Sequence, residues 1–220
     1  MAIHVTIPDQ FEPLGADPSG AEDRRQGDRI TTVYRPVVIH VGDFAGFCLV
    51  RNISAGGLLG MVYADFSTDQ PVRVEFSEHV HVEGVIAWAG DGRIGVAFEE
   101  EIDVLKVLQD LGRKMIDDRI NRAPRLSIAC QVGIESGGES TKAAMHNISQ
   151  RGLKITNIGL TPTDEVYVAL DGMETRKAVV RWTNDGMAGL NFVRPLEFDK
   201  LAGWVIAFQQ KRWQEQGRIA

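Results

Sequence analysis

Residues 85–98 read VIAWAGDGRIGVAF, and residues 179–192 read VVRWTNDGMAGLNF. Each stretch places an Asp-Gly turn between two strand-like runs, which is the strongest short-range signal for a β-hairpin. A second pair of similar stretches, NISAGG at 52–57 and NISQRG at 147–152, precedes them in the same order. The two pairs are offset by 94 and 95 residues, so a single gap aligns them. The sequence therefore predicts a tandem duplication.

Six short runs in each half alternate between apolar and polar residues. They lie near 31–41, 46–53, 57–62, 71–77, 80–89 and 93–98 in the first half, and near 125–135, 141–148, 152–156, 164–170, 175–183 and 187–193 in the second. Six short strands joined by Gly, Asp and Asn turns predict a small antiparallel barrel. Helical spacing of apolar residues predicts helices over 99–119 and 196–214. The expected fold is mostly β, with two tandem six-stranded antiparallel barrels, each followed by a C-terminal α-helix.

Charge is distributed unevenly along the 220 residues. Residues 1–110 carry 8 Lys or Arg against 18 Asp or Glu, and residues 111–220 carry 16 against 12. The acidic first half argues against nucleic-acid binding, and an anion there would need a local arginine cluster. The opposite signs could equally let the two halves attract each other. No apolar run reaches the roughly 20 residues of a membrane span, and no secretory signal opens the sequence, so we expect a cytoplasmic protein without membrane insertion.

Two arginines four residues apart, Arg25 and Arg29, precede the first polar turn. A guanidinium is a rigid fork of donors that suits phosphate oxygens or the edge of guanine, and its flat face stacks on a purine. Asn52 and Ser54 lie two residues apart near a strand end, so both can hydrogen-bond a ligand from the same side. The two glycines that follow let the backbone approach a ligand or supply a positive φ. Taken singly, each of these features is explained equally well by a solvated surface or an ordinary turn.

Together, Arg-x-x-x-Arg, Asn-x-Ser-x-x-Gly and the hairpin that contains Trp88 resemble the PilZ domain family. The resemblance extends from about residue 24 to 112 and again from about 121 to 217. It implies a six-stranded barrel with a C-terminal helix that binds the bacterial second messenger cyclic di-GMP, with no cofactor. The ligand-binding residues it implies are Arg24, Arg25, Arg29, Asn52, Ser54 and Gly57.

On this resemblance, Arg25 and Arg29 would hold the guanine edges and phosphates, and Arg24 could add a third cationic contact. Asn52, Ser54 and Gly57 would line the barrel face of the site. Ordering of residues 1–30 around the ligand would be the output signal. We expect a flexible lead-in at 1–23, a first domain at 24–118 with the intact motif, and a second domain at 119–220.

The second copy of the motif is incomplete. Arg125 aligns with the second arginine of the pair, but Asn121 stands where the first belongs, and Arg122 is one residue out of register. The turn residues of the second motif are Asn147, Ser149 and Gly152, with Arg151 in place of a glycine. Loss of one guanidinium removes charge-assisted hydrogen bonds. We expect one competent site, in the first domain, although the basic residues around the second motif leave a weaker second site open.

These patterns give two function hypotheses. The leading one is a receptor that binds cyclic di-GMP through the first domain and relays it to a protein partner through the second domain or the C-terminal helix. The alternative is an adaptor whose barrels bind protein partners without nucleotide. Binding of DNA or single-stranded nucleic acid is disfavoured because the first half is acidic and no exposed aromatic platform is evident.

The remaining candidate residues have simpler structural interpretations. His79, His81 and Glu83 alternate on one predicted strand, but without a fourth ligand nearby they are more typical of a solvated face than of a metal site. No histidine lies in a nucleophile motif, so we expect no catalytic residues and no enzyme activity. Trp88 and Trp182 recur at equivalent positions, which favours a packing role over base stacking.

The two cysteines, Cys48 and Cys130, sit in apolar runs at non-equivalent places. Buried reduced thiols are the simplest interpretation, rather than a disulfide or a reactive pair.

Overall fold

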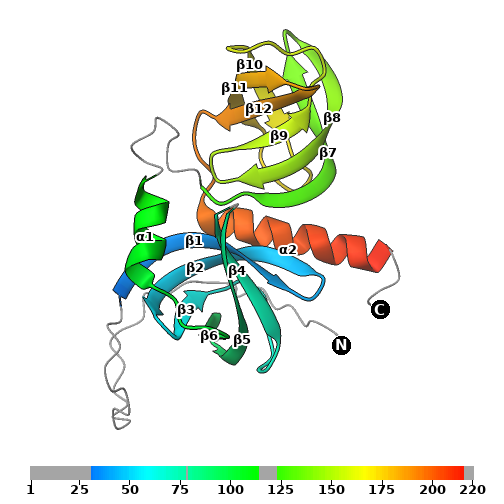
Figure 1. The fold of residues 1–220 in the computed structure, drawn as a ribbon. Helices are drawn as coiled ribbons and strands as arrows, with labels where there is room; N and C mark the ends of the chain where they lie inside the picture. The colour runs from blue at the N-terminus through cyan, green and yellow to red at the C-terminus, as the bar shows by residue number, and fades with distance from the viewer. Residues whose placement is uncertain (1–30, 78, 114–122, 216–220) are drawn as a thin grey trace. The chain divides into compact units, whose positions relative to one another are not determined.

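The protein is described by a computed structural model covering residues 31–77, 79–113 and 123–215 (Figure 1). The first half contains β1 (Thr31–Val41), β2 (Phe44–Ser54), β3 (Gly57–Met61), β4 (Pro71–Ser77), β5 (Val80–Gly90), β6 (Arg93–Phe98) and α1 (Val104–Arg113). The second half contains β7 (Leu126–Ser136), β8 (Glu139–Ser149), β9 (Gly152–Thr156), β10 (Glu165–Ala169), β11 (Arg176–Asn184), β12 (Met187–Phe192) and α2 (Phe198–Glu215).

Each half closes into a six-stranded antiparallel barrel. The strand orders are β1-β2-β3-β6-β5-β4 and β10-β11-β12-β9-β8-β7, and β4 and β10 close the two rings by pairing with β1 and β7. Closure removes the free sheet edges that a small open sheet would expose. The predicted fold class and the internal duplication are confirmed.

The two barrels bury equivalent side chains. Inward-facing positions of the first barrel include Ile53, Ile86 and Ile94, and their counterparts in the second are Ile148, Val180 and Ala188, all at most 1% exposed. The period-two alternation of the sequence therefore corresponds to side chains that point alternately into and out of each barrel. Each barrel has its own apolar core, and the chain divides into two compact units.

Two β-bulges recur at the same places in both barrels. In the first, the register shifts between Val50 and Asn52 and between Ile86 and Trp88. In the second, it shifts between Met145 and Asn147 and between Val180 and Trp182. A bulge adds one residue to a strand and re-aims the side chains after it. Both copies thus use a bulge immediately before the motif asparagine and before the tryptophan.

The predicted hairpin turns are confirmed. Asp91 and Gly92 have φ of 50° and 67°, and Asp185 and Gly186 have φ of 49° and 70°. Two successive central residues with positive φ are typical of the type I′ turn, whose twist matches the flanking antiparallel strands.

The first helix starts later than its apolar spacing suggested. Residues 99–103 are not helical, because the Ile102 N–H donates to Ala55 O at 2.9 Å and so joins this segment to the β2–β3 turn. The helix begins at Val104, where Asp103 Oδ1 accepts from the Lys106 N–H at 3.0 Å as an N-cap. The predicted domain boundary at 118/119 and the helix end at 119 lie outside the described residues.

The second compact unit contains β7–β12, α2 and residues Phe44–Phe47 of β2. Its C-terminal helix spans nearly the predicted 196–214 and buries Leu201, Ala202, Trp204, Val205 and Ile206. Among the described residues, no helix is long and apolar enough to cross a membrane.

Candidate functional site

The polar turn of the first barrel joins β2 to β3. Ile53 is buried in the core, while Asn52 and Ser54 on either side of it remain partly exposed. Asn52 and Ser54 therefore lie on the outer face of the barrel, where a ligand can reach them. The Ser54 hydroxyl donates to Gly57 O at 3.3 Å across the turn, so its proton is already used inside the motif.

Asn52 belongs to a row of residues that crosses four adjacent strands. It pairs with Leu59 on β3, Leu59 pairs with Gly95 on β6, and Gly95 pairs with Trp88 on β5. Directly paired residues in antiparallel strands point to the same face. The motif asparagine and the tryptophan thus lie on one outer surface, which we call the Asn52–Trp88 row.

Trp88 packs on the outer face of the barrel rather than in its core. Its side chain is 44% exposed, and its indole ring lies against Gly95, where a Cβ atom would come closer than 3.0 Å to the ring. Glycine at 95 therefore leaves space for the ring to lie on β6. An indole supported on one side and partly exposed on the other can stack on a planar ligand.

A cation beside this row was not identified from the sequence. Arg51 occupies the bulge before Asn52, and its guanidinium carbon lies 4.1 Å from the Tyr34 ring centroid. Arg51 Nη2 donates to the Tyr34 hydroxyl, and Nη1 lies 3.1 Å from Met61 Sδ. The side chain is therefore held in place before any ligand arrives. An arginine directly before the motif asparagine was a visible signal, but its tyrosine partner is 17 residues away in sequence.

The motif glycine has a structural role of its own. Gly57 has no positive φ, so the turn does not require glycine for that reason. A Cβ on Gly57 would lie closer than 3.0 Å to Val96 O, and a Cβ on the equivalent Gly152 would meet Leu190 O in the same way. Glycine at this position therefore lets the first residue of β3 or β9 lie directly against the neighbouring strand.

The arginines Arg24, Arg25 and Arg29 lie outside the described residues, so their placement relative to the Asn52–Trp88 row stays a prediction. In the second copy, Asn121 and Arg122 also lie outside them. Of the residues proposed to bind the ligand, the structure brings together Asn52, Ser54 and Gly57 at one turn.

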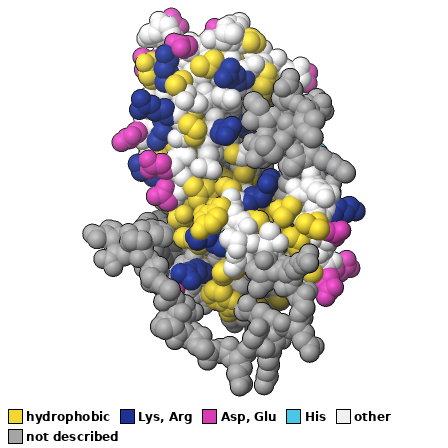
Figure 2. Space-filling view, turned by 90° about the vertical axis from the view of Figure 1, so that its left-hand side faces the viewer, with side chains coloured by type: hydrophobic (Ala, Val, Ile, Leu, Met, Phe, Trp, Pro, Cys, Tyr) yellow, Lys and Arg dark blue, Asp and Glu magenta, His cyan; other side chains and the backbone are white. Residues whose placement is uncertain are grey.

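The second barrel repeats the row with one change. Asn147 pairs with Lys154, Lys154 with Gly189, and Gly189 with Trp182, so a lysine replaces Leu59. Arg125 Nη1 donates to Asn147 Oδ1 at 2.8 Å, so the side-chain oxygen of the motif asparagine has a partner within the second barrel. Lys and Arg side chains are spread over the visible face of this barrel, in the upper part of Figure 2.

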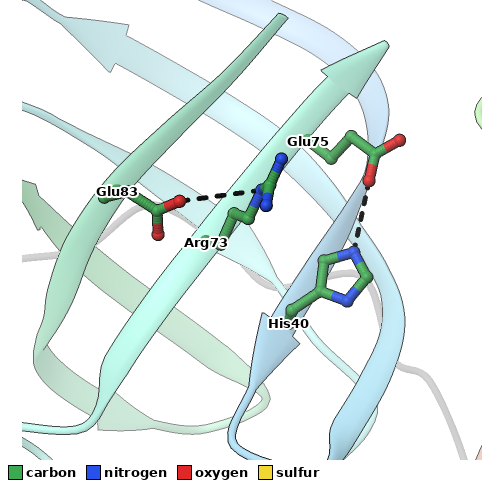
Figure 3. Close-up of polar contacts among 4 residues, drawn as sticks. All are labelled: His40, Arg73, Glu75 and Glu83. Atoms are coloured by element: carbon green, nitrogen blue, oxygen red, sulfur yellow. Dashed lines mark hydrogen bonds and ion pairs between the residues drawn. The ribbon is translucent and has the colours of Figure 1, made fainter. Parts of the chain in front are cut away.

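Polar pairs occupy the histidine- and glutamate-bearing face of the first barrel (Figure 3). Arg73 Nε lies 3.6 Å from Glu83 Oε1, and His40 Nε2 lies 3.2 Å from Glu75 Oε2. Glu83, one of the three candidate metal ligands, is thus engaged by an arginine. Within residues 31–77, 79–113 and 123–215, no group of three His, Cys, Asp or Glu side chains could hold a metal ion.

Both cysteines are free thiols. Burial raises the pKa of Cys48 to about 12. Cys130 is only half-buried, less than its apolar run suggested, and burial raises its pKa despite the opposing charge of Arg212.

Part of the chain is similar to a known domain family. Residues 23–114 match the PilZ domain family. Among solved structures, PlzA of Borreliella burgdorferi in complex with c-di-GMP is 12% identical, with 78% of this chain and 86% of that chain covered and a TM-score of 0.37. The inhibitor of motility MotI/DgrA of Bacillus subtilis is 17% identical, with 82% and 99% covered and a TM-score of 0.32.

YcgR of Escherichia coli in complex with c-di-GMP is 9% identical, with 84% of this chain and 88% of that chain covered and a TM-score of 0.31. No curated protein matched the chain. The family match covers β1–β6 and α1, and β7–β12 repeat the same strand order. The first barrel is a PilZ domain, and the second barrel repeats its architecture.

Proposed function

We propose that the protein is a receptor that binds cyclic di-GMP on the outer face of its first barrel. The observation that supports this best is the Asn52–Trp88 row, which sets an amide, a half-exposed indole and the neighbouring Arg51 on one surface of the PilZ domain. Cyclic di-GMP offers what these groups recognise, namely two guanine rings for stacking and hydrogen bonding and two phosphates for cations.

Each residue would contribute differently. The Asn52 amide can pair with a guanine edge, and the Trp88 indole can stack on a guanine ring. Arg51 would face a dianion with one side of its guanidinium already covered by Tyr34. Ser54 would accept rather than donate a hydrogen bond, because its proton is used on Gly57 O.

The arginine pair Arg25 and Arg29, with Arg24 beside it, would supply the remaining charge. The first half of the chain is acidic, with 18 Asp or Glu against 8 Lys or Arg, so a dianion gains nothing from the overall field and depends on these local cations. A charged hydrogen bond contributes about 1.5–3 kcal/mol, so each arginine accounts for roughly tenfold to a hundredfold in affinity.

The second barrel would not form an equal site. Asn147 Oδ1 already accepts a hydrogen bond from Arg125, and Asn121 replaces the first arginine of the pair. Its role in this proposal is to pass the ligand signal to a protein partner, with α2 as the other candidate surface. Binding without bond-breaking suffices for such a relay, so the proposal includes no catalytic step and no DNA contact, and it places the protein in the cytoplasm.

Isothermal titration calorimetry with cyclic di-GMP tests the proposal. Wild-type protein should bind at micromolar ligand, and Arg25→Ala and Arg29→Ala should abolish the heat while the circular dichroism spectrum is unchanged. Arg125→Ala, at the equivalent position of the second barrel, is the matched control and should bind like wild type. Absence of heat with the wild-type protein would refute the proposal.

The alternative is a nucleotide-independent adaptor. Its supporting observation is the second barrel, which keeps the fold and the turn while its asparagine is internally paired. Capture of a partner protein with equal yield in the presence and absence of cyclic di-GMP would favour the adaptor. A gel shift that weakens with salt would instead indicate nucleic-acid binding.

A further inference from the structure

The second barrel and its helix form a partly open cavity away from the repeated motif. It lies between α2 and the turn that joins β10 to β11, and its volume is about 510 Å³. Its lining includes the turn residues Asp171, Gly172, Met173 and Glu174 and side chains of α2. A volume of this size falls in the range of sites that hold small molecules, about 300–1,000 Å³.

Hydrogen bonds fix the shape of this cavity. The Trp204 indole N–H donates to Asp171 O at 2.7 Å, and the Met173 N–H donates to Leu170 O at 3.0 Å. Gly172, within that turn, has φ of 79°, a conformation that glycine adopts without strain. Lys211 Nζ lies 3.0 Å from Asp171 Oδ2 and adds a second link from α2 to the turn. The cavity is thus formed before any ligand binds.

One wall of the cavity is aromatic. The rings of Trp204 and Phe208 are stacked, with centroids 5.4 Å apart and planes inclined by 26°. Leu196, Met173 and Ala207 extend this apolar surface. An apolar wall of this kind favours a ligand with an apolar or aromatic body.

The charged groups of the lining are not all paired. Lys211 pairs with Asp171, and Lys200 Nζ lies 2.9 Å from Glu197 Oε2. Arg176 also lines the cavity, yet it has no ion pair among the described residues, and its buried Nε has no hydrogen-bond partner there. Glu174 is exposed at the edge. The lining therefore holds three cations against two acids, and Arg176 is the one of these cations that has no ion pair with a described residue.

Burial removes the hydration of the Arg176 Nε–H group, and no described residue replaces it with a hydrogen bond. An anionic group placed at Arg176 would supply a counter-ion and could hydrogen-bond the terminal nitrogens of the guanidinium. We propose that this cavity binds a small aromatic anion, with its ring on the Trp204–Phe208 wall and its carboxylate, sulfonate or phosphate group at Arg176. The second barrel then has a ligand site of its own, independent of the degenerate motif.

Two fluorescent probes test this proposal on the full chain. 8-Anilino-1-naphthalenesulfonate carries an aromatic body and one anionic group, and N-phenyl-1-naphthylamine has nearly the same body without the charge. Arg176→Gln should weaken binding of the sulfonate about tenfold, as expected for one charged hydrogen bond, and leave the neutral probe unchanged. Arg181→Gln, on the same strand but outside the lining, is the matched control and should affect neither probe.

Ala207→Trp provides a second variant, because it fills the cavity from an exposed position of α2 without changing the core. It should abolish binding of both probes. The proposal is overturned if wild-type protein binds neither probe, or if Arg176→Gln and Arg181→Gln bind the sulfonate equally. Because Arg176 lies in the second barrel, its substitution should leave the cyclic di-GMP titration unchanged, so the two proposals can fail separately.

Discussion

Gly57→Ala should destabilise the first barrel, whereas Gly56→Ala, one residue earlier in the same turn, should not. A Cβ on Gly57 would lie closer than 3.0 Å to Val96 O, a distance that real Cβ atoms essentially never show. The obstructing atom belongs to the backbone of β6, so no side chain can rotate away. A Cβ on Gly56 would have no atom within 4 Å, and Gly56 has no positive φ, so alanine fits there.

The size of the stability loss follows from the backbone shift that the new methyl group requires. To admit the new methyl group, β3 must shift away from β6 where Gly57 pairs with Ala97 and Leu58 with Val96. Overpacking of this kind costs about 1–3 kcal/mol, and each strained backbone hydrogen bond costs about 0.5–1.5 kcal/mol. The lower entropy of unfolded alanine returns about 0.4–1 kcal/mol. The net loss is about 2 kcal/mol, which lowers the melting temperature of a domain of this size by roughly 10 °C.

Thermal denaturation of the full chain, followed by circular dichroism, measures this effect. Gly152→Ala should lower the stability of the second barrel in the same way, because its Cβ would meet Leu190 O. Gly56→Ala should stay within about 0.5 kcal/mol of wild type. If Gly56→Ala and Gly57→Ala shifted the melting temperature equally, the steric argument would be refuted, since only one of the two positions is obstructed.

Three further predictions concern single side chains. Ser149→Ala should lower the free energy of unfolding, measured by urea denaturation, by about 1–2 kcal/mol, and Ser54→Ala should lower it less. The reason is that Ser149 is 1% exposed and donates to Gly152 O, whereas Ser54 is partly exposed. Equal losses would contradict this. Arg51→Ala should weaken cyclic di-GMP binding about threefold to tenfold in calorimetry, whereas the control Arg73→Ala, which faces Glu83, should leave it unchanged. Cys130 should react with Ellman's reagent at pH 8 before Cys48, because the raised pKa of about 12 keeps the Cys48 thiol protonated. Both labelling rates should rise with pH, because a thiol with a raised pKa still gains thiolate above pH 8. Faster labelling of Cys48 would overturn the order.

The barrels could be predicted from sequence because their signals are local. Alternation with period two identifies a strand, and an Asp-Gly pair between two strands identifies a hairpin. Because the sequence is duplicated, the hairpin is predicted twice, at Asp91 and at Asp185, and the two predictions support each other. The start of α1 was predicted wrongly because it depends on a hydrogen bond to Ala55, which is distant in sequence. The spacing of apolar residues carries no information about that hydrogen bond.

The candidate site was only partly predictable, for a similar reason. The sequence identified Asn52, Ser54 and Gly57, but the surface that they belong to depends on strand order and on bulges. Trp88 faces outward because of the bulge that precedes it, and its ring lies on the next strand because Gly95 leaves room for it. Arg51 is held by Tyr34 from another strand. These are pairings between strands, which single-sequence patterns do not specify.

The two copies of the motif show that its residues serve two separate purposes. The serine hydroxyl donates to the glycine carbonyl in both turns, and both glycines allow close approach to the next strand. The second barrel lacks the first arginine of the pair and still keeps the serine and the glycine, as the folding role of these residues requires. A ligand would also need the arginines beside the turn, and the second barrel has Asn121 in place of the first of them. An Asn-x-Ser-x-x-Gly turn alone therefore indicates this barrel, and only the turn together with the full arginine pair would indicate a nucleotide site.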